Sequence, residues 1–233
     1  MKINKFKLIA ILILLSTASF TQENVDWANL NRYKNENLEL KRISNNSNRV
    51  IFMGNSITEV WIKNSPEFFK SNSYIGRGIS GQTTAQMLIR FRADVVNLNP
   101  KVVVLLCGTN DIAGNQGLST LEMIEDNIVS MTEIAKSNNI KVILCSVLPV
   151  YDYPWKKGIE PAYKIIKLNN WLKKHSLKND IYYLDYFSSF VDKKNGMKSQ
   201  YSYDGVHPNK NGYKIMESLV QKAIIHVNKN IRK

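Results

Sequence analysis

The chain has 233 residues, with 44% hydrophobic and 22% charged side chains and a formal net charge of +13 at pH 7. This length, without linkers, repeats or low-complexity stretches, indicates a single domain with a proper buried core. Two cysteines and three scattered histidines exclude a metal site built from those ligands, and lysines spread along the chain favour a solvated basic surface over a nucleic-acid-binding patch.

The N-terminus has the three parts of a secretory signal peptide. Lysines within residues 1–7 are followed by an apolar run over residues 8–15 and by small and polar residues over 16–21. The apolar run is too short to span a bilayer comfortably, which disfavours a retained membrane anchor. The absence of a cysteine near the cleavage zone argues against lipid attachment. We therefore predict a signal peptide over residues 1–21, a single mature domain over residues 22–233, and a secreted or periplasmic protein without stable membrane insertion.

The mature sequence alternates apolar runs with helix-like segments. Residues 25–43 have an irregular helical pattern, which predicts an N-terminal helix packed against the body. Strands are expected over residues 49–53, 73–77, 101–107, 140–147 and 181–185. Helices are expected over residues 58–70, 83–97, 118–137, 160–178 and 209–229. Because the strands are apolar on both faces, the pattern predicts an α/β fold with a five-stranded parallel sheet covered on both sides.

Both cysteines lie in expected buried strands, Cys107 in the third and Cys145 in the fourth. Cysteines in such runs usually behave as small hydrophobic residues, and a disulfide needs a specific Cα separation and side-chain direction. An oxidising compartment would permit a bridge, but we expect free thiols.

Five residues that can carry chemistry follow the first, second, third and fifth strands: Ser56, Gly81, Asn110, Asp204 and His207. In a parallel sheet the loops at the carboxyl ends of the strands converge on one crevice. We therefore expect these residues to meet there. The aromatic segment over residues 149–160 follows the fourth strand, so it is expected to wall the same crevice.

Three of these residues have the roles that serine-based ester hydrolysis needs. Ser56 can be the nucleophile and His207 the general base that takes its proton. Asp204 lies three residues before His207, close enough for its carboxylate to orient the imidazole through Nδ1. Taken alone, the serine is typical of a helix N-cap and the Asp-x-x-His pair of a surface turn. Their combination in one crevice favours the catalytic interpretation.

The other two residues can donate hydrogen bonds to the oxyanion of an acyl-transfer intermediate. Gly81 offers a backbone N–H without side-chain obstruction, and Asn110 offers a carboxamide N–H. The alternatives are a loop glycine and a helix cap. We expect the neighbouring Asp111 to cap or brace the loop, because a second free carboxylate beside an oxyanion would oppose the chemistry.

The segments 54–57 and 108–111, Gly81 and the Asp204-x-x-His207 pair resemble the four motif blocks of the SGNH (GDSL-like) hydrolase superfamily. The resemblance implies a flavodoxin-like three-layer α/β/α sandwich and an esterase without a cofactor. It also implies catalytic roles for Ser56, Gly81, Asn110, Asp204 and His207. Asn55 and Ile57 replace the Asp and Leu of the GDSL spelling, so the loop keeps a hydrogen-bonding side chain but loses a charge.

The candidate substrate contacts are Arg77, Trp61, Tyr151, Tyr153 and Trp155. Arg77 could pair with a carboxylate or phosphate of the substrate, or it could pin a neighbouring acidic loop instead. The aromatic side chains, Trp155 above all, could stack on a sugar ring or close the core.

The first functional hypothesis is a carboxylic-ester hydrolase that removes short acyl groups, acetyl in particular, from a small-molecule or saccharide ester. The compact chain has no obvious lid or apolar insertion for a long lipid tail, which disfavours a true lipase. The alternative within the same chemistry is a lysophospholipase, a thioesterase or a platelet-activating-factor acetylhydrolase-like enzyme. The remote alternative is a binding module without turnover. The sequence carries no signal for a metal, a nucleic-acid partner or an oligomeric state.

Overall fold

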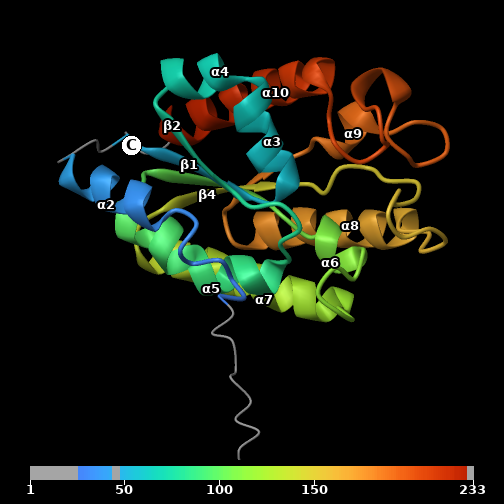
Figure 1. Ribbon diagram of the computed structural model, residues 1–233, viewed down its shortest axis with the longest axis horizontal. Helices are drawn as coiled ribbons and strands as arrows, with labels where there is room; N and C mark the ends of the chain where they lie inside the picture. The colour runs from blue at the N-terminus through green and yellow to red at the C-terminus, as the bar shows by residue number, and fades with distance from the viewer. Residues whose placement is uncertain (1–25, 44–47, 230–233) are drawn as a thin grey trace, which may run out of the picture.

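A sheet of five parallel strands forms the centre of the protein, of which a computed structural model describes residues 26–43 and 48–229 (Figure 1). The strands are β1 Val50–Gly54, β2 Tyr74–Gly78, β3 Val102–Leu106, β4 Lys141–Cys145 and β5 Tyr182–Leu184. Their order is β2-β1-β3-β4-β5, with Val50 in register with Tyr74 of β2 and Val102 of β3. This is the flavodoxin-like order, in which ligands bind where the winding reverses between β1 and β3. The expected parallel sheet is confirmed.

Helices cover both faces of this sheet. The described helices are α2 Lys34–Arg42, α3 Ser56–Asn64, α4 Pro66–Ser71, α5 Thr84–Asp94, α6 Thr109–Ile112, α7 Leu121–Ser137, α8 Ala162–Lys178, α9 Phe187–Phe190 and α10 Lys210–Lys229, with short 3-10 helices η1 Val96–Leu98 and η2 Ser199–Tyr201. Figure 1 shows α5, α7 and α8 on one face of the sheet and α3, α4 and α10 on the other. The protein is therefore the three-layer α/β/α sandwich that the sequence predicts.

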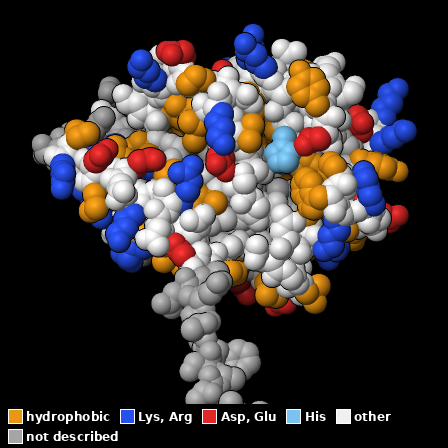
Figure 2. All heavy atoms as spheres, in the orientation of Figure 1, with side chains coloured by type: hydrophobic (Ala, Val, Ile, Leu, Met, Phe, Trp, Pro, Cys, Tyr) orange, Lys and Arg blue, Asp and Glu red, His pale blue; other side chains and the backbone are white. Residues whose placement is uncertain are grey.

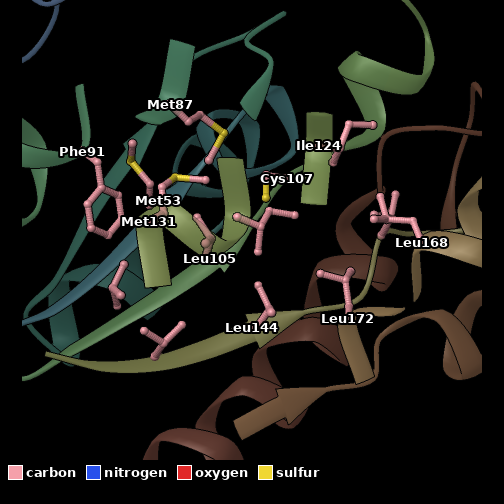
Figure 3. Close-up of a cluster of buried hydrophobic side chains, with 14 of the residues drawn as sticks. Met53, Met87, Phe91, Leu105, Cys107, Ile124, Met131, Leu144, Leu168 and Leu172 are labelled. Atoms are coloured by element: carbon pink, nitrogen blue, oxygen red, sulfur yellow. The ribbon is translucent and has the colours of Figure 1, made fainter. Parts of the chain in front are cut away.

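Each face of the sheet has its own hydrophobic core, because successive strand residues point to opposite faces. On the face covered by α5, α7 and α8, Met53, Leu105 and Leu144 of the strands meet Phe91 of α5 and Met131 of α7 (Figure 3). All five side chains are 0% or 1% exposed. This packing holds the strands rigidly beneath the loops that follow them.

An aromatic cluster closes the opposite face. Trp61 stacks on Phe68 and Tyr213 at ring-centroid distances of 5.7 and 5.6 Å and meets Phe52 of β1 edge to face at 5.5 Å. The Tyr213 hydroxyl donates to the carbonyl oxygen of Ile57 at 2.8 Å. The last helix, α10, therefore holds the first turn of α3.

The N-terminal helix begins later than its sequence pattern predicts. α2 starts at Lys34, and the described residues before it form turns. The Asp26 carboxylate accepts the N–H groups of Leu30 and Asn31, each at 2.8 Å, and Asn29 has a left-handed φ of +57°. A side chain that bonds the nearby backbone and a left-handed residue both favour a turn over a helix.

The helix expected over residues 58–70 is two helices. α3 already begins at Ser56, and Pro66 is the first residue of α4. Proline has no N–H to extend the preceding helix, but its φ suits a first helical turn. The chain therefore breaks between these two helices.

The two cysteines lie on opposite faces of the sheet. Cys107 belongs to the core under α5, α7 and α8, and Cys145 to the core under α3, α4 and α10. Both are buried and free, as expected, and burial raises the pKa of both thiols. They act as core residues.

The expected signal peptide over residues 1–21 lies outside the described residues. Of the helices that the structure does describe, none has the length and apolar character needed to cross a membrane.

Candidate active site

Ser56 lies where a strand turns directly into a helix. β1 ends at Gly54 and α3 begins at Ser56. A Cβ atom on Gly54 would lie 2.0 Å from Thr58 Oγ1, so glycine lets the helix start this close to the strand. Asn55 is the N-cap, and its Oδ1 accepts the N–H of Ile57 at 3.1 Å. The asparagine that replaces the aspartate of the GDSL spelling therefore still caps the helix, without the charge.

His207 and Asp204 extend a hydrogen-bonded chain that starts at Ser56. Ser56 Oγ lies 2.9 Å from His207 Nε2, and His207 Nδ1 lies 2.6 Å from Asp204 Oδ2. The other carboxylate oxygen, Oδ1, accepts the backbone N–H groups of Val206 at 2.9 Å and of His207 at 2.8 Å. Ser202 Oγ donates to the carbonyl oxygen of His207 at 2.7 Å and closes the loop. The loop holds the imidazole and the carboxylate in one mutual geometry.

The same hydrogen bonds keep Asp204 ionised. Partial burial would by itself raise the pKa of the Asp204 carboxyl. The bonds from the His207 imidazole and from the backbone N–H groups of His207 and Val206 outweigh burial and lower the pKa to about 2. A charged carboxylate favours the imidazole tautomer with its proton on Nδ1, which leaves Nε2 free to accept a proton from Ser56. This arrangement is suited to general-base chemistry at neutral pH.

Gly81 lies at the same site, on the loop that follows β2. Its φ of +78° lies in the left-handed region that favours glycine, and a Cβ there would meet no atom within 4 Å. Among the described residues, no carbonyl accepts the Gly81 N–H. The preceding Ser80 is braced from α3, because Glu59 Oε2 accepts its N–H at 2.8 Å and its hydroxyl at 2.6 Å. This brace ties the Gly81 turn to the helix that carries Ser56.

Asn110 lies in α6, directly after β3, and two neighbours orient its carboxamide. Its Oδ1 accepts from Asn115 Nδ2 at 3.0 Å, and its Nδ2 donates to the carbonyl oxygen of Gln82 at 2.9 Å. A carboxamide has two N–H donors, so one N–H of Asn110 remains for an oxyanion. Asp111 has the bracing role that the sequence predicts, because its carboxylate accepts the N–H of Thr84 at 2.9 Å at the start of α5.

One open crevice of about 580 Å³ brings together Ser56, Gly81, Asn110 and His207. Its lining residues are Ser56, Val60, Ser80, Gly81, Asn110, Asn115, Gln116, Trp155 and His207. Figure 2 shows a histidine at the surface, between an acidic side chain and hydrophobic side chains. Trp155 is 47% exposed, and the centre of its ring lies 6.2 Å from the centre of the His207 ring. The loop over residues 149–160 therefore supplies a wall of the crevice, as its place after β4 predicts.

The other aromatic candidates lie outside the crevice. Tyr153 is fully buried, and its hydroxyl donates to the carbonyl oxygen of Thr109 at 2.9 Å, which anchors the loop that carries Trp155. Trp61 is 1% exposed within the aromatic core. Tyr151 is exposed on the loop but does not line the crevice. The expectation that Trp61 and Tyr153 contact substrate is thus corrected, because both side chains pack in the interior.

Arg77 does not line the crevice, which corrects the expectation that it binds substrate. Its buried guanidinium donates from Nε and Nη2 to Asn37 Oδ1 at 3.0 and 2.8 Å. Nη1 pairs with Glu36 at 3.4 Å, and the guanidinium lies 4.5 Å from the centre of the Tyr33 ring. The N-terminal segment that supplies these acceptors lies beside the edge strand β2, so Arg77 pins that segment to the sheet. Arg77 therefore has the second of the two roles considered for it, because it holds a neighbouring segment that carries the acidic Glu36.

Three residues that the sequence did not single out support the site. Arg90 is fully buried, donates to the carbonyl oxygen of Gly54 at 2.9 Å and pairs with Asp94 at 2.8 Å. Glu59 braces the Ser80 turn, and Asn115 orients the carboxamide of Asn110. Glu59 could have been found from its place one turn after the serine, and Asn115 from its nearness to Asn110. The Asp94 partner lies one turn later in the same helix, but no local pattern shows that Arg90 also bonds the carbonyl oxygens of Gly54 in β1 and Arg77 in β2.

Comparisons with known proteins place this architecture in a family. Residues 52–215 match the GDSL-like Lipase/Acylhydrolase family. A solved Bacteroides fragilis NCTC 9343 protein, classed as an acylhydrolase, is 50% identical, with a TM-score of 0.84 over 86% of this chain and 98% of that one. A GDSL-like lipase from Bacteroides thetaiotaomicron VPI-5482 is 47% identical, with a TM-score of 0.84 over 86% of this chain and 99% of that one.

A curated relative matches a shorter stretch. The uncharacterised lipoprotein YqeF of Bacillus subtilis (strain 168) is 33% identical over 82 residues. These residues are 34% of this chain, and the match spans about a third of the length of YqeF. The family match, in contrast, extends over most of this chain and includes the strands and loops that build the crevice. The chain belongs to the GDSL-like lipase/acylhydrolase family and is an acylhydrolase.

Proposed function

We propose that this acylhydrolase is an exported serine esterase that removes short acyl groups, acetyl in particular, from carbohydrate esters. The observation that carries the proposal is the hydrogen-bonded chain from Ser56 through His207 to Asp204 at an open crevice. Gly81 and Asn110 line the same crevice, each with a donor available for an oxyanion. A nucleophile, a base, an orienting carboxylate and two oxyanion donors are the parts of a serine acyl-transfer site.

Hydrolysis proceeds in two halves through an acyl-enzyme. Ser56 Oγ attacks the carbonyl carbon of the ester while His207 Nε2 takes the serine proton. The resulting oxyanion accepts hydrogen bonds from the Gly81 N–H and the second Asn110 N–H. The C–O bond to the alcohol then breaks, and the alcohol leaves with the proton from His207. Water attacks the acyl group with His207 again as base, which releases the carboxylic acid and restores Ser56.

The lining of the crevice supports a polar alcohol and a short acyl group. Ser80, Asn115 and Gln116 offer hydrogen-bonding groups, and Trp155 offers an indole face beside the imidazole. Among the described residues that line the crevice, Val60 is the one with an aliphatic side chain. A long acyl chain gains about 0.8 kcal/mol for each methylene that it buries in an apolar site. The exposed surface of the crevice is mostly apolar, but the crevice is open and does not enclose a long chain. A sugar has hydroxyls for the polar groups of the lining and an apolar ring face for the indole of Trp155.

A panel of esters tests the substrate. p-Nitrophenyl acetate, butyrate and octanoate vary the acyl chain, while acetylated oligosaccharides and lysophosphatidylcholine vary the alcohol. We expect kcat/KM to fall from acetyl to octanoyl and to be higher for the acetylated saccharide than for the lysophospholipid. The opposite order would support a lysophospholipase, a thioesterase or a platelet-activating-factor acetylhydrolase-like enzyme.

The same panel tests the nucleophile. Folded Ser56→Ala protein should lose activity by about 10⁴-fold or more, because triad members act as a unit. Turnover close to that of the parent would overturn the serine mechanism. A parent protein that hydrolyses none of these esters would support a binding module.

Replacing Trp155 tests the sugar wall. Trp155→Ala should lower kcat/KM for the acetylated saccharide more than for p-nitrophenyl acetate. Tyr163→Ala is the matched control, because Tyr163 is an exposed aromatic on α8 that does not line the crevice. Equal effects of Trp155→Ala on both esters would show that the indole does not bind the sugar.

Export is the second part of the proposal. It rests on the signal-peptide pattern over residues 1–21 and on the relative that is a lipoprotein. N-terminal sequencing of the protein from fractionated cells should find it outside the cytosol and cleaved near Thr21. Full-length protein confined to the cytosol would contradict export without affecting the esterase proposal.

A further inference from the structure

Asn115 connects the wall of the crevice to Asn110 through side-chain hydrogen bonds. Trp155 Nε1 donates to Asn115 Oδ1 at 3.1 Å, and Asn115 Nδ2 donates to Asn110 Oδ1 at 3.0 Å. Asn110 Nδ2 donates in turn to the carbonyl oxygen of Gln82 at 2.9 Å. The chain of donors begins at an indole that can only donate and ends at a carbonyl that can only accept. Each amide between them therefore has one favoured orientation.

The favoured orientation of Asn110 is the one that ester hydrolysis needs. With Oδ1 toward Asn115, the amide group gives one hydrogen to Gln82 and keeps the other for the crevice that Asn110 lines. A carboxamide rotated by half a turn would set oxygen against the Gln82 carbonyl oxygen and nitrogen against Asn115 Nδ2. Asn110 is 2% exposed, so water does not readily satisfy these mismatched groups.

We propose that Asn115 is a positioning residue that keeps the Asn110 carboxamide in the orientation of an oxyanion donor. This inference rests on the proposed function, because it assigns Asn110 to the oxyanion. Residue 115 is bound to residue 110 twice, since its backbone N–H also donates to the Asn110 carbonyl oxygen at 3.0 Å. That second bond stays when the side chain is changed, so the turn is retained in variants. Asn115 is itself exposed, so its side chain is not needed to fill the core.

Asn115→Asp is the informative substitution because it keeps the size of the side chain and removes its donor. The introduced carboxylate can still accept from Trp155, but its second oxygen faces Asn110 Oδ1 and favours a rotated carboxamide. We expect kcat for p-nitrophenyl acetate to fall by about 10- to 100-fold, which is less than complete loss of an oxyanion donor. KM should stay within about twofold, because the oxyanion forms after substrate binds. Asn115→Ala removes the hydrogen bond to Asn110 Oδ1 without placing an oxygen opposite it, so the Asn110 carboxamide is not driven to rotate. This variant should lower kcat by less than about tenfold.

Two further variants separate orientation from charge and from general damage. Leu118→Asp places the same charge on the same loop at a side chain that is 90% exposed and does not line the crevice, so kcat should stay within about twofold. In an Asn110→Ala background, Asn115→Asp should cause no further loss, because the group that it misorients is absent. Thermal unfolding of each variant shows that the proteins compared are folded.

The outcomes distinguish this inference from the proposed function. Asn115→Asp with the same kcat as Leu118→Asp would overturn the positioning role while Asn110→Ala and Ser56→Ala remain impaired. An equal loss from Asn115→Asp in the parent and Asn110→Ala backgrounds would also overturn it, because the effect would then not pass through Asn110. Asn110→Ala with parental kcat would overturn the oxyanion assignment itself, and this inference with it.

Discussion

Replacing Asp204 by asparagine changes the protonation of the imidazole with almost no change of shape. Asp204 Oδ1 accepts the N–H groups of Val206 and His207 at 2.9 and 2.8 Å, so the oxygen of the asparagine keeps that place. The amide nitrogen then faces His207 Nδ1, where Oδ2 now lies 2.6 Å away. A donor at that position requires an Nδ1 that carries no proton.

The loss of activity follows from the tautomer. A neutral imidazole with an unprotonated Nδ1 carries its proton on Nε2, which lies 2.9 Å from Ser56 Oγ. A protonated Nε2 cannot accept the serine proton, so the general base is lost while the geometry remains. Loss of the base by this route is expected to lower kcat by about 10⁴-fold. At about 1.36 kcal/mol per tenfold, this corresponds to about 5.4 kcal/mol of transition-state stabilisation.

Initial rates with p-nitrophenyl acetate at neutral pH measure this effect. Ser202→Ala is the control, because it removes the contacts of the Ser202 hydroxyl with the His207 carbonyl oxygen at 2.7 Å, Asp204 Oδ1 at 3.1 Å and the Gly205 N–H at 2.9 Å, but leaves the carboxylate opposite Nδ1. These contacts hold the loop and do not set the proton on Nδ1, so kcat of the control should fall by less than about tenfold. Urea unfolding should show that Asp204→Asn is folded, but less stable than the parent at neutral pH, because a carboxylate whose pKa is lowered by folding has been removed. A folded Asp204→Asn protein with kcat within tenfold of the parent would refute the reasoning.

Asn110→Ala should lower kcat by about 10²–10³-fold with KM near the parental value, and an effect on KM alone would remove Asn110 from the oxyanion hole. Partial burial raises the pKa of Glu59, but the hydrogen bonds from Ser80 and the charge of Lys63 outweigh it and lower the pKa below its ordinary value. The stabilisation by Glu59 is therefore complete above its unfolded pKa and is lost as pH falls through the folded one. The urea midpoints of parent and Glu59→Gln should differ at neutral pH and converge in acid, and a difference that grows in acid would contradict this sign. Ionisation of Asp204 should cause no step in the kcat of the parent above about pH 4, because the pKa of that carboxyl is about 2; a step in kcat above about pH 4 that is assigned to Asp204 by NMR titration of its carboxyl would contradict this. Arg77→Ala should lower the free energy of unfolding by about 2–4 kcal/mol, since it leaves buried acceptors unpaired, whereas the ratio of saccharide to aryl acetate hydrolysis should not change.

The sequence alone determined the plan of the fold and which residues meet at the crevice. Runs that are apolar on both faces specify buried parallel strands, and such strands bring the residues after their carboxyl ends together. Ser56 and Asn110 follow β1 and β3, which are neighbours in the sheet. Asp204 and His207 are three residues apart, so a local turn is enough to join them. These relations depend on short segments and on one general rule of sheets, so they can be predicted without knowledge of other contacts.

The tertiary structure decided which side chains face the crevice and what holds them there. Trp61 and Tyr153 look as suitable for a pocket as Trp155 in the sequence, but two of the three pack in the interior. Arg77 bonds to the N-terminal segment because that segment lies beside β2, a pairing between residues about forty positions apart. The link from Trp155 to Asn115 spans a similar separation. Burial and hydrogen bonding of this kind depend on which elements become neighbours, and the periodicity within a single segment carries no information about its neighbours in space.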